Sequence, residues 1–138
     1  MLVDRTEIKI RFKEVDSLQI VWHGHYVSYF EDGRESFGSK YGLGYMDIYR
    51  NGYSAPVVNV NCNYKKSLYY GDTAIVETTL VNTPAAKIHF TYKIFNAKTN
   101  ELVCDGQSIQ VFMDVKTNML QLANPDFFEQ WKLKNGLL

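Results

Sequence analysis

The chain has 138 residues, 46% of them hydrophobic and 14% aromatic, and its 15 lysines and arginines balance 15 aspartates and glutamates. This length is enough to bury one hydrophobic core without disulfide or metal support, so we expect a single domain over residues 1–138. The formal net charge of zero argues against the basic surface that nucleic acid or an anionic membrane would bind.

The first residues and the two cysteines predict a cytoplasmic protein. Residues 1–10 lack the basic start and apolar core of a signal peptide, and no run approaches the roughly 18 apolar residues of a membrane span. Cys62 and Cys104 lie in alternating apolar runs, where a free thiol behaves as a small buried hydrophobe. Free thiols favour a reducing compartment.

The first part of the chain predicts a strand followed by a long helix. Residues 7–13 alternate apolar and charged side chains, which is typical of a half-buried strand with Phe12 on its inward face. Residues 14–22 form an apolar, irregular loop that we expect to pack against another part of the protein. A helix is expected over residues 24–41. Its apolar stripe consists of Tyr26, Phe30, Gly33, Phe37 and Tyr41.

Glycines mark the middle and the end of this helix. Gly33 costs about 1 kcal/mol relative to alanine in a helix, so we expect the backbone to approach a sheet closely there. Gly42 and Gly44 carry the usual C-terminal glycine signal. Residues 45–54 are expected to form a connection with a turn at Asn51–Gly52, and this segment is a candidate border of a ligand pocket.

Strands dominate the rest of the chain. Gly106 predicts a β-bulge or a tight bend in the last of them. Residues 125–131 predict a short amphipathic helix or turn, and short connections between the later strands favour an antiparallel meander. Alternation places the strands over residues 56–66, 73–81, 87–95 and 101–113.

These elements predict an α+β fold in which one long helix lies on a strongly twisted antiparallel sheet. A single helix covers only one face of such a sheet, so the other face must be solvated or buried in an oligomer. The 10 tyrosines and 8 phenylalanines, many at strand or helix spacing, favour at least a dimer.

Asp16 is the first candidate for chemistry. A turn aspartate after a strand is its ordinary interpretation. However, it stands near the apolar step Ile20-Val21-Trp22 and seven residues before His23, where a helix is about to begin. A charged side chain in apolar surroundings is usually paired or functional. We therefore interpret Asp16 as a candidate nucleophile or general base.

The expected helix start supplies backbone N–H groups at His23, Gly24 and His25 that can stabilise an oxyanion. Gly24 would let a substrate approach the backbone closely. His23 is either a helix-cap histidine or a catalytic one, and the pattern leaves both interpretations open. A His-x-His pair without a third ligand predicts no metal site.

The other reactive side chains are weaker candidates, and no cofactor is expected. Neither cysteine has a histidine nearby in sequence, and the chain lacks both a G-x-S-x-G elbow and a phosphate-binding glycine loop. Lys65, Lys66 and Lys87 are solvated charges by default, with contact to a ligand's phosphates as the alternative.

Three segments of the chain resemble the hotdog-fold acyl-CoA thioesterases of the 4-hydroxybenzoyl-CoA thioesterase type. They are residues 16–34, residues 56–78 and the closing strands up to Met113. In one large branch of that family, a loop runs from an aspartate through a hydrophobic step to a histidine, a small residue and a tyrosine that opens the central helix. The matching residues here are Asp16, His23, Gly24 and Tyr26, with Glu31 matching an acidic residue in the helix.

The chain also departs from the family pattern. Ser17-Leu18-Gln19 replaces a glycine-rich turn after the aspartate, which implies a different substrate preference. His25 stands where that branch commonly has asparagine, and Phe12 stands where some members have tyrosine.

The resemblance implies a hotdog fold, with a five-stranded antiparallel sheet wrapped around one long central helix, and active sites at a subunit interface. Asp16 would attack the thioester or activate water, and His23 would assist or position groups. A backbone N–H of His23 or Gly24 would hold the thioester oxygen.

The resemblance also implies acyl-CoA as the substrate, acyl carrier protein as the alternative thiol carrier, and a homodimer or homotetramer. Tyr26, Lys65 and Lys66 are the candidate substrate-binding residues. Two other functions remain open. One is a hotdog protein that binds acyl-CoA or acyl carrier protein without hydrolysis, and the other is an assembly module whose aromatic faces serve only subunit contacts.

Overall fold

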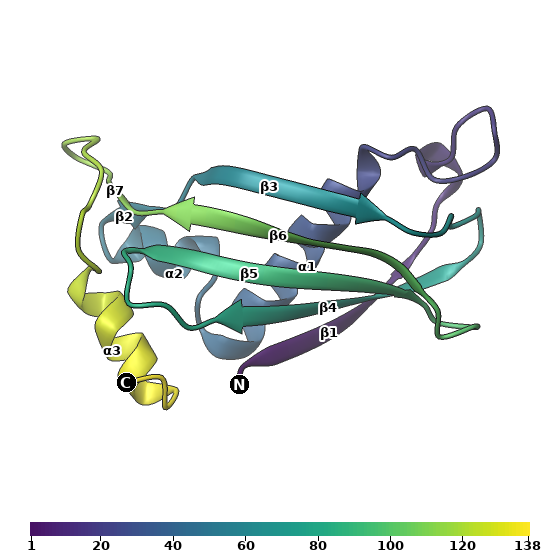
Figure 1. The fold of residues 1–138 in the computed structure, drawn as a ribbon. Coiled ribbons are helices and arrows are strands. Elements are labelled where there is room, and N and C mark those ends of the chain that lie inside the picture. Colours follow the sequence, from purple (N-terminus) through teal and green to yellow (C-terminus); the bar gives the residue numbers. More distant parts are fainter.

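The computed structural model describes all of residues 1–138, and at its centre one long helix lies against one face of an antiparallel sheet (Figure 1). The helix is α1 (His25–Tyr41). The sheet has five strands in the order β1-β4-β5-β6-β3, and the expected α+β architecture is confirmed. These strands are β1 (Val3–Lys9), β3 (Val57–Tyr64), β4 (Thr73–Val81), β5 (Lys87–Asn96) and β6 (Leu102–Val111).

The smaller elements gather at the two ends of the sheet. The loop from β1 to α1 contains a short 3-10 turn, Phe12–Glu14, and lies at one end (Figure 1). At the other end lie α2 (Tyr45–Arg50), α3 (Asp126–Lys134), and a two-stranded ribbon of β2 (Tyr53–Ser54) and β7 (Met113–Asp114). None of the helices combines the length and the apolar character needed to cross a membrane.

The apolar stripe of α1 packs directly on the sheet. The ring of Phe30 stacks on that of Tyr92 with centroids 4.4 Å apart. A Cβ atom at Gly33 would lie 2.5 Å from Thr78 Oγ1 and 2.7 Å from Val76 Cγ1, so only glycine allows this approach. The close contact expected at Gly33 is therefore confirmed, and burial of each large ring contributes about 1.5–3 kcal/mol.

The first strand begins and ends earlier than its sequence pattern indicates. The alternation predicts residues 7–13, whereas β1 spans Val3–Lys9 and Phe12 is 73% exposed instead of inward. The strand ends because the Glu14 carboxylate accepts the Arg11 N–H at 2.8 Å and closes a 3-10 turn. The regular alternation carried no sign of that turn.

The order and the register of the strands correct two expectations. β4, β5 and β6 form a meander, but β3 pairs with β6 at the edge, so the chain crosses the sheet between β3 and β4. Gly106 is not at a bulge, since it pairs in regular register with Cys62 and Tyr92. Its missing side chain instead leaves room for Phe30, whose Cε2 would be 2.7 Å from a Cβ there.

Candidate active site

Asp16 lies at the start of a tight turn in the loop between β1 and α1. Its N–H donates to the Ile20 carbonyl at 2.9 Å, and the Leu18 N–H donates to its carboxylate Oδ1 at 2.8 Å. Gln19 adopts the left-handed conformation, with φ 66°, at the place where the family resemblance shows a glycine-rich turn. Asp16 is half-buried, and its second carboxylate oxygen accepts no hydrogen bond. The aspartate is thus a turn residue with one carboxylate oxygen that has no partner in the protein.

The start of α1 supplies two backbone N–H groups rather than the three that were expected. The His25 N–H donates to the Trp22 carbonyl at 2.9 Å and is therefore occupied. The N–H groups of His23 and Gly24 have no acceptor in the protein. These two are the candidate oxyanion donors, and they carry the positive end of the helix dipole.

His23 is exposed and is held through its backbone and its ring. Its carbonyl accepts the Tyr64 hydroxyl at 2.8 Å, and its ring lies 5.0 Å from the Trp22 ring and 6.3 Å from the Tyr64 ring, centroid to centroid. No hydrogen bond or ion pair joins the His23 ring to Asp16 within one protomer. Tyr64 was missed by sequence reasoning, because its alternation on β3 gave no sign that its hydroxyl reaches the helix start.

Gly24 has a different neighbour from the one expected. A Cβ atom there would lie only 2.2 Å from Cζ3 of Trp22, whose ring covers the Gly24 Cα. The glycine thus accommodates Trp22, and a substrate approaching that Cα atom would meet the indole ring. The Gly24 N–H remains without an acceptor.

The three candidate substrate-binding residues have unequal access to a ligand. Tyr26 is 3% exposed and belongs to the hydrophobic core, and burial raises its pKa to about 12. Lys66 forms an ion pair with Glu101. Lys65 is exposed and makes no ion pair, which leaves it as the lysine able to meet a phosphate.

Neither cysteine is suited to act as a nucleophile. Burial raises the pKa of Cys62, and it raises that of Cys104 to about 12. Both thiols therefore stay protonated near neutral pH, as expected from their place in apolar strands.

A cavity of about 590 Å³ opens near the other end of α1. It lies between that helix, α2 and the sheet, and it includes none of the candidate catalytic residues. Its floor contains Ile88 and Phe90 from β5, and Arg34 and Glu35 of α1 lie at its side. Gln110 also lines it, and the Gln110 Oε1 atom is buried without a partner. The expectation that residues 45–54 border a pocket is confirmed, but no sequence signal indicated the residues on α1 and β6.

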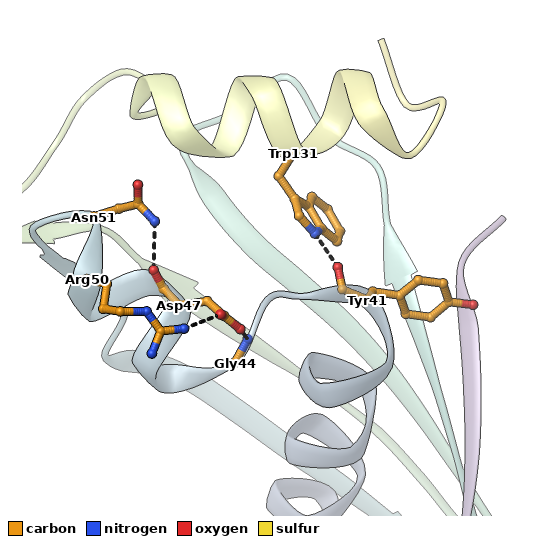
Figure 2. Close-up of polar contacts among 6 residues, drawn as sticks. All are labelled: Tyr41, Gly44, Asp47, Arg50, Asn51 and Trp131. Carbon is orange, nitrogen blue, oxygen red and sulfur yellow. Dashed lines mark hydrogen bonds and ion pairs between the residues drawn. The ribbon is translucent and has the colours of Figure 1, made fainter.

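Hydrogen bonds fix α2 as one wall of this cavity (Figure 2). Asp47 accepts the Gly44 N–H at 2.8 Å and the Arg50 guanidinium at 2.7 Å. The Asn51 side-chain amide donates to the Asp47 carbonyl at 2.8 Å. Nearby, the Trp131 indole N–H of α3 donates to the Tyr41 carbonyl at 2.7 Å and fixes the end of α1.

Comparisons with known proteins agree with this architecture. Residues 10–132 match the model of the family described as the thioesterase-like superfamily. A Bacillus subtilis (strain 168) protein named "Putative acyl-CoA thioesterase YneP" is 35% identical over 130 residues, which are 92% of this chain and 94% of that protein. An Arabidopsis thaliana protein named "Acyl-acyl carrier protein thioesterase ATL3, chloroplastic" is 27% identical over 118 residues, which are 86% of this chain and 62% of that protein.

A solved structure described as a DHNA-CoA thioesterase from Staphylococcus aureus superimposes with a TM-score of 0.85 at 31% sequence identity. The match covers 99% of this chain and 93% of that one. The sheet, its central helix and these matches define a hotdog-fold protein. The chain belongs to the thioesterase-like superfamily, which confirms the family resemblance and the expected class of enzyme, a thioester hydrolase.

Proposed function

We propose that the chain hydrolyses acyl-CoA to a carboxylic acid and free CoA, with Asp16 as nucleophile or general base. The observation that carries this proposal is the loop from Asp16 to Gly24. It begins with a carboxylate oxygen that accepts no hydrogen bond and ends at two N–H groups without acceptors. The similarity to a protein named as an acyl-CoA thioesterase supports the same substrate class.

The chemistry follows from these groups. The Asp16 carboxylate either attacks the thioester carbonyl, which expels the CoA thiolate and leaves a mixed anhydride that water then cleaves, or takes a proton from a water molecule that attacks the carbonyl itself. The N–H groups of His23 and Gly24 stabilise the negative charge that develops on the carbonyl oxygen. A thiolate is a good leaving group, so an ionised carboxylate and an oxyanion site suffice without a strong acid. The exposed His23 ring would position the substrate.

A homodimer through β3 would complete the site. Strand β3 lies at the edge of the sheet, and seven of its eight residues are exposed. An exposed edge strand of this kind favours pairing with a second copy of the chain. Antiparallel pairing would bring the Tyr64 end of one β3 beside the Val57 end of the other. Tyr64 holds His23, whereas Val57 pairs with the cavity residue Gln110. The acyl group would then enter the partner's cavity while Lys65 meets the phosphates of CoA.

The direct test is the conversion of Asp16 to asparagine. We expect Asp16→Asn to lower thiol release from a panel of acyl-CoA substrates by at least about 10²-fold, because a neutral amide neither attacks nor accepts a proton. Asp126→Asn, at an exposed position in the first turn of α3, is the matched control and should retain wild-type turnover. A folded Asp16→Asn protein with undiminished turnover would refute the role of Asp16.

A second candidate is action on acyl carrier protein, favoured by the similarity to the protein named as an acyl-acyl carrier protein thioesterase. Parallel assays with one acyl group on CoA and on carrier protein separate the two carriers. Saturable binding of either thioester without any thiol release would instead favour a non-hydrolytic binding protein.

A further inference from the structure

Glu14 is a buried charge to which the proposed chemistry gives no role. It lies two residues before Asp16 and is only 4% exposed. Its Oε1 accepts the Arg11 N–H at 2.8 Å, and its Oε2 pairs with the Arg11 guanidinium at 3.1 Å. Burial raises the pKa of Glu14, but the hydrogen bonds from Arg11 outweigh burial and hold that pKa below its usual range. The carboxylate is therefore ionised at neutral pH.

The backbone of the same residue closes the base of the candidate catalytic loop. The Trp22 N–H donates to the Glu14 carbonyl at 3.0 Å, and Val15 and Val21 form the next bridge. These contacts hold Val15, the residue before Asp16, opposite Val21, two residues before His23. The separation between the Asp16 carboxylate and the N–H groups of His23 and Gly24 therefore depends on these backbone contacts, which join the two ends of the loop.

The negative charge of Glu14 also acts on a residue of α1. Tyr29 of α1 is completely buried, and its hydroxyl makes no hydrogen bond. Burial raises the pKa of Tyr29, and the negative charge of Glu14 is the next largest contribution. The Glu14 carboxylate is thus paired with Arg11, two residues after the end of β1, and acts electrostatically on a tyrosine near the start of α1.

We infer that Glu14 is a positioning residue for the proposed hydrolysis, which sets Asp16 at the correct distance from the N–H groups of His23 and Gly24. This inference rests on the proposed function. A displacement of about 1 Å between reacting groups can lower a rate by about 10²-fold, so the loop base need shift only slightly to lower turnover. Glu14 itself does not touch the reacting atoms.

The test compares Glu14→Gln with Glu77→Gln in steady-state hydrolysis of acyl-CoA. Glu77 on β4 also pairs with an arginine, Arg5 on β1, at 3.0 Å, but it lies outside the loop and is less buried, so it serves as the control for loss of a glutamate–arginine pair. We expect Glu14→Gln to lower kcat at least about tenfold while KM changes less than about threefold, because orientation is lost and substrate contacts remain. Glu77→Gln should keep wild-type kcat and KM.

A second variant covers the case in which Glu14→Gln does not fold. Arg11→Met removes the guanidinium at an exposed side chain and should give a smaller loss of kcat, again with KM unchanged. Wild-type kcat per folded enzyme in both variants would overturn the positioning role and leave the proposed function intact, since a merely stabilising residue changes only the folded fraction. Absence of thiol release from the wild type would overturn both proposals.

Discussion

Glu14 and Asp16 are two residues apart but experience opposite surroundings. The first is buried and paired with Arg11, whereas the second is half-buried and keeps one oxygen without a partner. A paired, buried carboxylate stabilises a fold, and a carboxylate with an unpaired oxygen can act on a substrate. The loop therefore holds one paired carboxylate and, two residues further on, the carboxylate proposed to react.

The paired state of Glu14 gives a pH dependence to stability. Because its folded pKa is lowered, its contribution is fully present above the ordinary value of 4.5 and is lost as the pH falls through the folded value. At pH 7 we expect Glu14→Gln to lower the free energy of unfolding by about 1–3 kcal/mol. Urea unfolding at about pH 3 should give a smaller difference between the two proteins. A difference that grows on acidification would contradict this assignment.

The contact between Gly24 and Trp22 predicts a second effect at residue scale. In Gly24→Ala the new methyl group must displace the Trp22 ring, which is 48% exposed and can swing away. We expect kcat/KM to fall about tenfold, because the Trp22 ring no longer lies over the start of α1. Stability should change little, because no core residue moves. In a Trp22→Ala background the same glycine substitution should have almost no further effect. Equal losses in both backgrounds would show that the indole ring is not the cause.

The elements differ in how far the sequence determines them. The alternation on β4 and β5 and the stripe on α1 predict those elements closely, because each buries one face against a single layer. The end of β1 depends on the Glu14 side chain, which closes a local turn with Arg11 that the alternation does not indicate. The pairing of β3 with β6 depends on contacts between distant residues, so local patterns could not supply it. The same holds for the site. Asp16 and the helix start are close in sequence, whereas Tyr64 and the cavity meet α1 only through the fold.

The exposed edge strand β3 is the expected dimer interface. We expect the wild-type protein to be at least dimeric at micromolar concentration. Val60→Lys should give monomers, because the lysines of the two protomers would lie close together near the two-fold axis and repel each other, with no acidic residue on β3 to pair with them. Val115→Lys changes a residue of similar exposure outside β3 and should remain dimeric. Light scattering measures both, and a dimeric Val60→Lys protein would place the interface elsewhere.

At the scale of the whole molecule, the Asp16 loop and the cavity lie at opposite ends of α1, and the proposed function makes them two parts of one site. That helix has 17 residues and is about 25 Å long, with the Asp16 loop near its start and the cavity against its second half. A two-fold pairing of β3 strands would bring the loop of one protomer to the cavity of the other. The central claim is therefore that one hydrolytic site needs both protomers.

A heterodimer measures this claim most directly. One protomer carries Asp16→Asn and the other carries Ser39→Trp, which fills the cavity from an exposed position on α1. Each variant alone should be nearly inactive. In a doubly tagged, purified heterodimer, one site would combine an intact loop with an intact cavity, so we expect about half of the wild-type thiol release per dimer. A heterodimer as inactive as its parents would contradict the shared site.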